Sequence, residues 1–136
     1  MKSFALTCVV AVAIAGCGGG APRDSAKEFS GEKAKVAAPV EALETAARDR
    51  KAEPVCSQLL SDLLLAQLKE QGTNCRTAVK EAFEDADSLD LTVDEITITG
   101  DKAVAKITSG TGSDKKSDTL ELARDGVVWK IDLLRT

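Results

Sequence analysis

Apolar residues recur at helical spacing in the first half of the chain and at strand spacing in the second half. One stripe at i, i+4, i+7 and i+11 is formed by Val36, Val40, Leu43 and Ala47. This spacing predicts a helix with one buried face, beginning near Lys33. Pro39 lies inside the stripe, and a proline either opens a helix in its first turn or kinks a longer one. We expect the longer, kinked helix, ending in the charged run at residues 48–51.

Two shorter helical segments follow. Pro54 suits the first turn of a helix whose apolar residues are Val55, Cys56, Leu59 and Leu60. Ser61 is a good N-cap for a segment at residues 62–71, and Gly72 is a natural stop for it. The side chains of this segment that we expect to point inward are Leu63, Leu64 and Leu68.

The best helical pattern in the chain begins at Cys75. Its apolar positions, from i to i+11, are Cys75, Ala78, Val79, Ala82, Phe83 and Ala86. Thr73 and Asn74 are both competent to cap this helix. We therefore expect a helix that begins at Cys75 and carries that residue on its buried face.

The period changes from helical to two after Asp87. One face of the first expected strand carries Leu89, Leu91 and Val93. The strand then continues in the opposite phase with Ile96 and Ile98. Such a switch at Asp94 and Glu95 predicts a β-bulge, which bends and twists a strand. A Gly-Asp turn at residues 100–101 leads into a second strand with Ala103, Ala105 and Ile107 on one face.

Two more strands complete the pattern. A polar loop at residues 109–116 precedes a strand with Leu120 and Leu122, and an Asp-Gly pair at residues 125–126 is a strong hairpin signal. One face of the last strand carries Val127, Trp129, Ile131 and Leu133. Helices followed by a four-stranded antiparallel meander predict an α+β fold with helices on one face of the sheet. We expect residues 32–136 to form this single domain.

Several short motifs carry a family resemblance. They are Cys56 before a Leu-Leu pair, Cys75 at the start of the next helix, a Gly-Asp turn followed by Ala-Val-Ala, and the ending Trp-Lys-Ile-Asp at residues 129–132. With the order of elements, they resemble the nuclear transport factor 2-like superfamily, and within it small bacterial lipoproteins of uncharacterised function. The resemblance covers about residues 33–135. It implies a curved sheet wrapped around a long first helix to form a cone.

The first residues have the features of a secretory signal. Lys2 gives a basic start, and residues 4–15 are apolar except for Thr7, a run too short to span a bilayer. Residues 14–17, Ile-Ala-Gly-Cys, resemble the lipobox of bacterial lipoproteins, in which a peptidase cuts before a cysteine that carries a diacylglycerol. The resemblance implies removal of residues 1–16 and an acyl anchor at Cys17 on the extracytoplasmic face of the cell membrane. The alternative is an ordinary signal peptide cut nearby, with Cys17 unmodified.

Residues 17–31 are rich in Gly, Pro, Ser and charge, and Phe29 is their only large apolar side chain. This composition predicts a flexible tether, with a binding tail as the alternative. The formal net charge of the whole chain is −4. A mildly acidic domain argues against nucleic acid as a partner.

The cysteine count leaves one pair. Cys8 leaves with the signal and Cys17 is acylated, so Cys56 and Cys75 remain in an oxidising compartment. The pair predicts a structural disulfide. A zinc site would need more soft ligands, and the chain has no histidine. A redox pair would favour the close Cys-x-x-Cys spacing.

Candidate catalytic residues are few. Enzymes of the resembled superfamily, such as ketosteroid isomerases and dehydratases, use a carboxylate base in the mouth of the cone with a Tyr, a His or a neutral acid. Nothing here matches those sites, and the chain has no His and no Tyr. The best candidates are Asp94 and Glu95, because a bulge can turn a charged side chain toward a cavity. Trp129 fits either a ligand platform or the core.

Two functions fit these observations. We expect a non-catalytic module, held at the membrane by its lipid, that binds a small apolar ligand or another envelope protein and uses no metal or cofactor. The alternative is a small enzyme of the isomerase or dehydratase kind that uses a cavity carboxylate. The state of the cone interior separates the two, because an enzyme needs an open cavity with a carboxylate in it.

Overall fold

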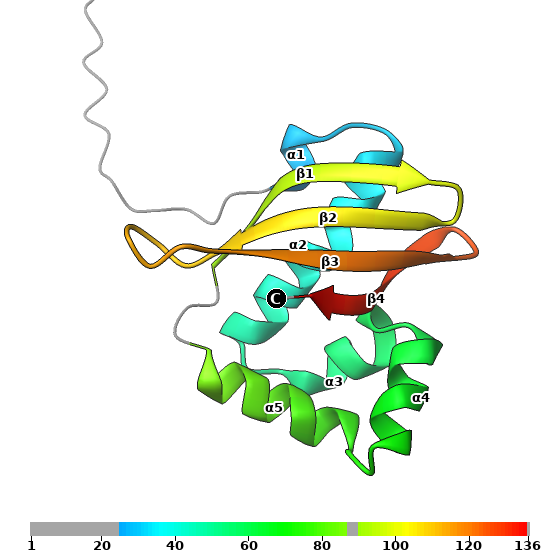
Figure 1. The fold of residues 1–136 in the computed structure, drawn as a ribbon, viewed down its shortest axis with the longest axis vertical. Coiled ribbons are helices and arrows are strands. Elements are labelled where there is room, and N and C mark those ends of the chain that lie inside the picture. Colours follow the sequence, from blue (N-terminus) through cyan, green and yellow to red (C-terminus); the bar gives the residue numbers. More distant parts are fainter. Residues whose placement is uncertain (1–24, 87–89, 136) are drawn as a thin grey trace, which may run out of the picture.

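A computed structural model describes residues 25–86 and 90–135 of the chain (Figure 1). The signal segment and the acylated cysteine predicted above lie outside these residues, as does Leu89. Regular structure is found within the predicted tether, since a short helix α1 (Ser25–Glu28) contacts the next helix and Phe29 packs against the core. The predicted tether, residues 17–31, is therefore too long at its C-terminal end.

The long helix α2 (Glu32–Arg48) crosses one face of the sheet. It runs through Pro39 as one continuous element, although proline lacks the N–H that would bond to the carbonyl of Lys35. Val36 and Val40 are almost fully buried against the sheet, as the apolar stripe predicted. Packing of the apolar stripe therefore outweighs the local cost of Pro39, because tertiary packing rather than local preference stabilises most protein helices.

The predicted second helix is present as a short segment whose hydrogen-bond pattern changes along its length. Helix α3 (Ala52–Pro54) continues into a π-helical turn η1 (Val55–Leu59), and Leu60 is extended rather than helical. Leu60 forms an isolated parallel bridge with Ile131, and the N–H of Ser61 donates to the carbonyl of Ile131. The chain leaves the helix here because the last strand offers it a backbone partner.

Helices α4 (Asp62–Glu70) and α5 (Cys75–Asp85) begin at the predicted caps. The Ser61 hydroxyl accepts from the N–H of Leu64, and the Asn74 side chain accepts from the N–H of Arg76. Gly72 ends α4 at φ 72°, where its N–H bonds to Lys69 and the next N–H bonds to the carbonyl of Leu68. Few side chains of either helix are buried.

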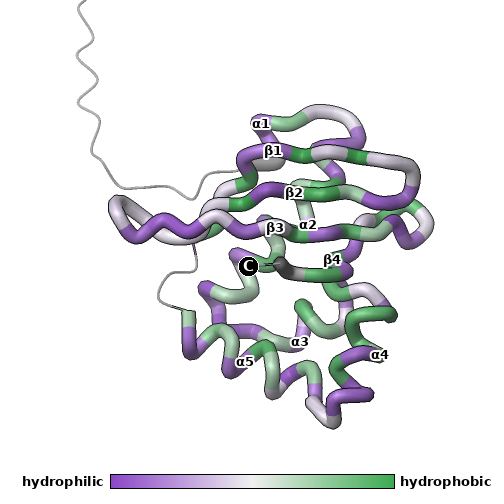
Figure 2. The backbone as a smooth tube through the Cα atoms, viewed as in Figure 1, coloured by the Kyte–Doolittle hydropathy of each residue, from purple (hydrophilic) through white to green (hydrophobic). Residues whose placement is uncertain are grey.

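The inward leucines of α4 were predicted only in part. Leu64 and Leu68 lie against the core, but Leu63 is 56% exposed and Leu65 takes its place. The backbone tube of α4 is coloured hydrophobic over most of its length in Figure 2, yet none of its residues is fully buried. In α5 only Phe83 is buried.

The four strands form an antiparallel meander in the order β1-β2-β3-β4. They are β1 (Leu91–Thr99), β2 (Lys102–Ser109), β3 (Lys116–Asp125) and β4 (Val128–Arg135). Two-residue turns join β1 to β2 and β3 to β4, and their glycines, Gly100 and Gly126, have φ near 60°. Figure 1 shows α2 behind this sheet, with α3, α4 and α5 beyond the β4 edge. The predicted α+β class, with helices on one face of the sheet, is confirmed.

Bulges bend the two outer strands. The β1–β2 register shifts between Val93 and Glu95, so that Val93 and Ile96 are both buried, as the phase switch predicted. A second shift lies in β4, where Ile131 pairs with Leu122 and Leu133 pairs with Glu121. This shift was not predicted. It places Leu133 on the face of Glu121 rather than on the face of Ile131.

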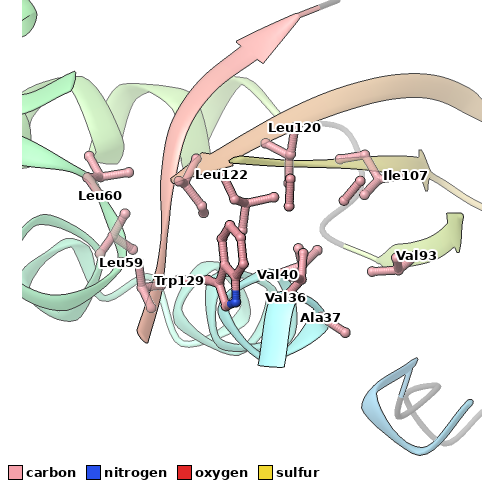
Figure 3. Close-up of a cluster of buried hydrophobic side chains, with 14 of the residues drawn as sticks. Val36, Ala37, Val40, Leu59, Leu60, Val93, Ile107, Leu120, Leu122 and Trp129 are labelled. Carbon is pink, nitrogen blue, oxygen red and sulfur yellow. The ribbon is translucent and has the colours of Figure 1, made fainter. Parts of the chain in front are cut away.

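The core lies between the sheet and the face of α2 and η1 (Figure 3). Trp129 stands near its centre, with the valines of α2 on one side and Leu59 and Leu60 on the other. Its buried members from the sheet are Val93, Ile96, Ala103, Ala105, Ile107, Leu120, Leu122, Trp129 and Ile131. Among the helices of this described part, none is long and apolar enough to cross a membrane.

Candidate functional site: an apolar cavity beneath the sheet

A cavity of about 340 Å³ lies between the sheet, α5 and the end of α2. Its apolar lining consists of Leu43, Ala47, Val55, Leu60, Leu64, Val79, Ala82, Phe83, Ala86, Leu91, Ile107, Leu120 and Ile131. Its polar lining consists of Ser109 and Asp118. The space between the sheet and the helices is therefore not completely filled, and the surface it offers is almost entirely hydrocarbon.

Helix α5 leaves this space open because its inward face is made of small residues near its C-terminal end. Ala82 and Ala86 line the cavity, yet both are exposed to solvent. The sequence predicted this face as buried. Phe83 meets that expectation, whereas the two alanines are too small to reach the opposite wall. The helix therefore forms a wall of the cavity rather than a closed layer of core.

Asp118 places a carboxylate in the cavity wall. It pairs in register with Ile107, and its side chain lies on the same face of β3 as the buried Leu120 and Leu122. Asp118 is half-buried. Sequence reasoning missed this residue, although the period of two that marks Leu120 and Leu122 as inward extends back to position 118.

Asp94 and Glu95 do not line the cavity. The carboxylate of Asp94 accepts from the Thr108 hydroxyl at 2.6 Å, and that of Glu95 accepts from the Lys106 ammonium at 2.7 Å. Asp94, Glu95 and Lys106 are exposed, and Thr108 is half-buried. The bulge turns Val93 and Ile96 inward, and so it turns the two residues between them outward. As cavity carboxylates, Asp94 and Glu95 are contradicted by the structure.

Glu44 is a buried carboxylate that the sequence did not single out. It lies on α2 and forms an ion pair with Arg48, whose guanidinium also reaches Asp90 at 2.8 Å. Burial raises the pKa of Glu44, and the Arg48 charge and a hydrogen bond from the Leu91 backbone oppose that rise. These contacts tie the end of α2 to the start of β1. Glu44 therefore braces the fold beside the cavity and does not line it.

A second buried carboxylate, Asp132, lies on the outer side of the sheet. Asp132 alternates away from the buried Trp129 along the strand, yet it is only 9% exposed. It accepts from the Lys102 ammonium at 2.8 Å and from the Ser61 hydroxyl at 2.6 Å. The Ser61 oxygen also accepts from the N–H of Leu64, so both of its roles are structural. The cluster joins β4, β2 and the cap of α4.

Asp132→Asn is expected to destabilise the protein by about 2 kcal/mol at neutral pH, as is typical for a hydrogen-bonded charge. The hydrogen bonds from Lys102 and Ser61 lower the pKa of Asp132 below its ordinary value of 3.8. The unfolded chain therefore takes up this proton first, and the ion's contribution is lost as pH falls below 3.8. Urea unfolding at several pH values should show the gap between wild type and variant closing in acid.

The control for this prediction is Asp94→Asn, which alters an exposed carboxylate and should shift stability by no more than about 0.5 kcal/mol. A gap between wild type and Asp132→Asn that stays constant from neutral to acid pH would contradict the assignment.

Trp129 belongs to the core rather than to the cavity. It is 3% exposed, and its indole N–H donates to the Glu32 carboxylate at 2.9 Å. The Arg124 guanidinium stacks 4.7 Å from the centroid of the ring and pairs with Glu32 at 3.1 Å. The Trp129 hydrogen bond, followed by that from Lys35, lowers the pKa of Glu32. The cluster fastens the start of α2 to β3 and β4.

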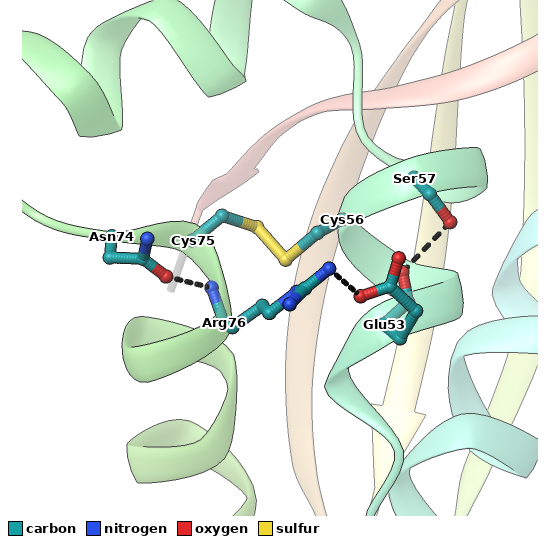
Figure 4. The surroundings of a disulfide bond; sticks show 6 residues. All are labelled: Glu53, Cys56, Ser57, Asn74, Cys75 and Arg76. Atoms are coloured by element: carbon teal, nitrogen blue, oxygen red, sulfur yellow. Dashed lines mark hydrogen bonds and ion pairs between the residues drawn. A yellow bond between two sulfur atoms is a disulfide. The ribbon is translucent and has the colours of Figure 1, made fainter.

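The predicted disulfide is present. Cys56 in η1 and Cys75 at the start of α5 are bonded, with their Cα atoms 6.0 Å apart (Figure 4). Arg76 and Glu53 form an exposed ion pair beside it. The bridge joins α5 to the turn that supplies Val55 to the cavity wall. Within residues 25–86 and 90–135, no group of three His, Cys, Asp or Glu side chains is placed to hold a metal ion.

No protein-family model matches the chain, and no curated protein matches it. A solved de novo designed protein with the nuclear transport factor 2 fold is similar at a TM-score of 0.48 and 15% identity, covering 77% of this chain and 85% of the design. A Campylobacter jejuni protein described as a nuclear transport factor 2-like transpeptidase is similar at a TM-score of 0.45 and 18% identity. That likeness covers 68% of this chain and 92% of the other. Neither likeness bears on what this chain binds or does.

Proposed function

We propose that this chain is a lipid-anchored, extracytoplasmic binding protein whose cavity takes a small apolar ligand without chemical change. The cavity carries this proposal. Its volume, about 340 Å³, falls within the range of about 300–1,000 Å³ that small-molecule sites occupy, and its lining is apolar except for Ser109 and Asp118. An apolar ligand that binds against such a wall is stabilised by about 25 cal/mol for each Å² of apolar surface removed from water.

The distribution of charge supports binding over catalysis. The buried carboxylates Glu44 and Asp132 each have a basic partner and lie outside the cavity lining. A catalytic role would fall on Asp118, in place of the predicted Asp94 and Glu95. Asp118 would have to act with Ser109, the other polar residue of the wall, and a serine hydroxyl without a base is a weak proton donor or nucleophile.

Cys17 supplies the proposed anchor, and the early start of the fold makes the tether short. Residues 18–24 separate Cys17 from Ser25 at the start of α1, and these eight Cα-to-Cα steps reach at most about 28 Å. A domain held this close to the bilayer is well placed to exchange an apolar ligand with it. The alternative partner, another envelope protein, would need an interface on the outer surface and would not need the cavity.

The cavity is tested with N-phenyl-1-naphthylamine, a neutral fluorophore that brightens in apolar surroundings, added to the purified full chain. Wild type should bind it saturably. Ala82→Phe places a ring in the wall of the cavity and should weaken binding at least tenfold. Thr77→Phe, on α5 but outside the cavity lining, is the matched control and should bind like wild type. Absence of saturable binding to wild type, or equal binding by Ala82→Phe, would reject the cavity as a ligand site.

A further inference from the structure

Asp118 differs from the other strand carboxylates because it has no partner within the described part of the chain. Asp94, Glu95 and Asp132 accept from Thr108, Lys106 and Lys102. For Asp118 the structure shows no hydrogen bond and no ion pair among residues 25–86 and 90–135. Its neighbours in the cavity wall are hydrocarbon, apart from the Ser109 hydroxyl.

The Ser109 hydroxyl is directed elsewhere, since it donates to the carbonyl of Lys116 at 3.5 Å. Lys116 lies two residues from Asp118 on the same face of β3, but no ion pair joins them. A half-buried carboxylate against apolar walls is unfavourable unless a donor or cation meets it. The side chains of the described cavity do not supply one.

A polar hollow of about 590 Å³ adjoins the cavity, and the two share Ala86 and Ser109. Lys116, two residues from Asp118 on β3, lines this hollow. The charged residues of the hollow are Asp85, Asp114, Lys115 and Lys116, which are balanced in sign. A ligand with its tail in the apolar cavity would place its head group beside Asp118 and extend into this hollow. The hollow itself does not favour one sign of charge, so the negative charge of Asp118 determines which head group the site prefers.

Resting on the proposed ligand-binding function, we propose that the ligand is a cationic amphiphile: an apolar tail with an ammonium head group that pairs with Asp118. The tail fills the space between α5 and the sheet. The ammonium donates a hydrogen bond to the Asp118 carboxylate. It thereby provides the partner that the described side chains of the protein do not provide. Neutral amphiphiles fit the same cavity more weakly, and anionic ones are repelled by the carboxylate.

Three amphiphiles of equal tail length test this inference on the purified full chain: octylamine, octanol and octanoate. Each displaces bound N-phenyl-1-naphthylamine. For wild type, octylamine should displace the fluorophore at about one tenth of the octanol concentration, because a charge-assisted hydrogen bond in a partly dry site is worth about that factor. Octanoate should be the weakest of the three.

Asp118→Asn keeps the shape of the side chain and removes its charge. In this variant octylamine should lose its advantage over octanol, with both displacement concentrations referred to the variant's own affinity for the fluorophore. Asp114→Asn removes a carboxylate from the adjoining hollow and should leave the advantage intact.

The outcomes separate the two proposals. Saturable fluorophore binding with no octylamine preference in wild type, or with a preference that survives Asp118→Asn, overturns the head-group inference and leaves the cavity function standing. Wild type that does not bind the fluorophore at all overturns both.

Discussion

Replacing Cys56 or Cys75 by serine is expected to lower the melting temperature by on the order of 12 °C. The bridge closes a loop of 19 residues, and the chain-entropy description assigns such a loop about 3 kcal/mol. In a domain of about 100 residues each kcal/mol shifts the midpoint by about 4 °C or more. Differential scanning calorimetry under oxidising conditions measures this shift.

The packing of the two helices explains why the effect should be large in this molecule. Helix α4 buries no residue fully, and α5 buries only Phe83. The hydrophobic contribution from this region is therefore small, and the bond between Cys56 and Cys75 supplies much of the constraint that keeps α5 against η1. Because α5 forms a wall of the cavity, loss of the bridge should also weaken fluorophore binding.

The double variant, with both cysteines replaced by serine, is the decisive control. It should melt within about 2 °C of either single variant, since each single change already removes the whole bridge. Dithiothreitol should destabilise wild type and leave the double variant unchanged. Single variants that melt like oxidised wild type would show that the bridge contributes nothing to stability.

The parts of the fold predicted correctly are those in which local pattern and tertiary packing agree. The α2 stripe faces the sheet, and the caps at Ser61 and Asn74 fall where polar residues precede apolar runs. The hairpins follow their glycine signals, and the β1 bulge follows from a visible change of phase. In each case the local sequence is enough to determine the local conformation.

The incorrect predictions arise where a distant segment decides the conformation. Leu60 continues an apolar helical pattern, but its bridge to Ile131 pulls it into an extended form. The second bulge, at the position of Asp132, has no signal in the alternation of β4. A register shift against β3 and the partners Ser61 and Lys102 create it. Such long-range pairings are not encoded in one strand's period.

The candidate site shows the same division. The prediction placed the bulge in the correct strand but pointed the wrong side chains inward. Val93 and Ile96 are apolar and occupy the interior, so the charged residues between them face outward. Asp118 lay in plain alternation with Leu120. It was missed because a polar residue at an inward position gives no sign, in sequence alone, that a cavity lies beside it.

Cys17→Ala is expected to have the largest effect on location, because it removes the proposed acyl anchor. Two acyl chains, at about 0.8 kcal/mol per buried CH₂, suffice for stable attachment, whereas the apolar run at residues 4–15 is too short to span a bilayer. In a bacterial host, wild type should fractionate with membranes and incorporate an alkyne-labelled fatty acid. The variant should lose the label and leave the membrane fraction almost completely.

Cys8→Ala is the matched control, because it changes a cysteine in the same apolar run without touching the lipobox. It should keep both the label and the membrane fraction, and the mass of the extracted protein should correspond to residues 17–136 plus the lipid. A Cys17→Ala protein that stays in the membrane fraction, or that still carries the label, would overturn the anchor. Since the cavity test uses purified protein, that result would leave the ligand site standing and would change only where the ligand is met.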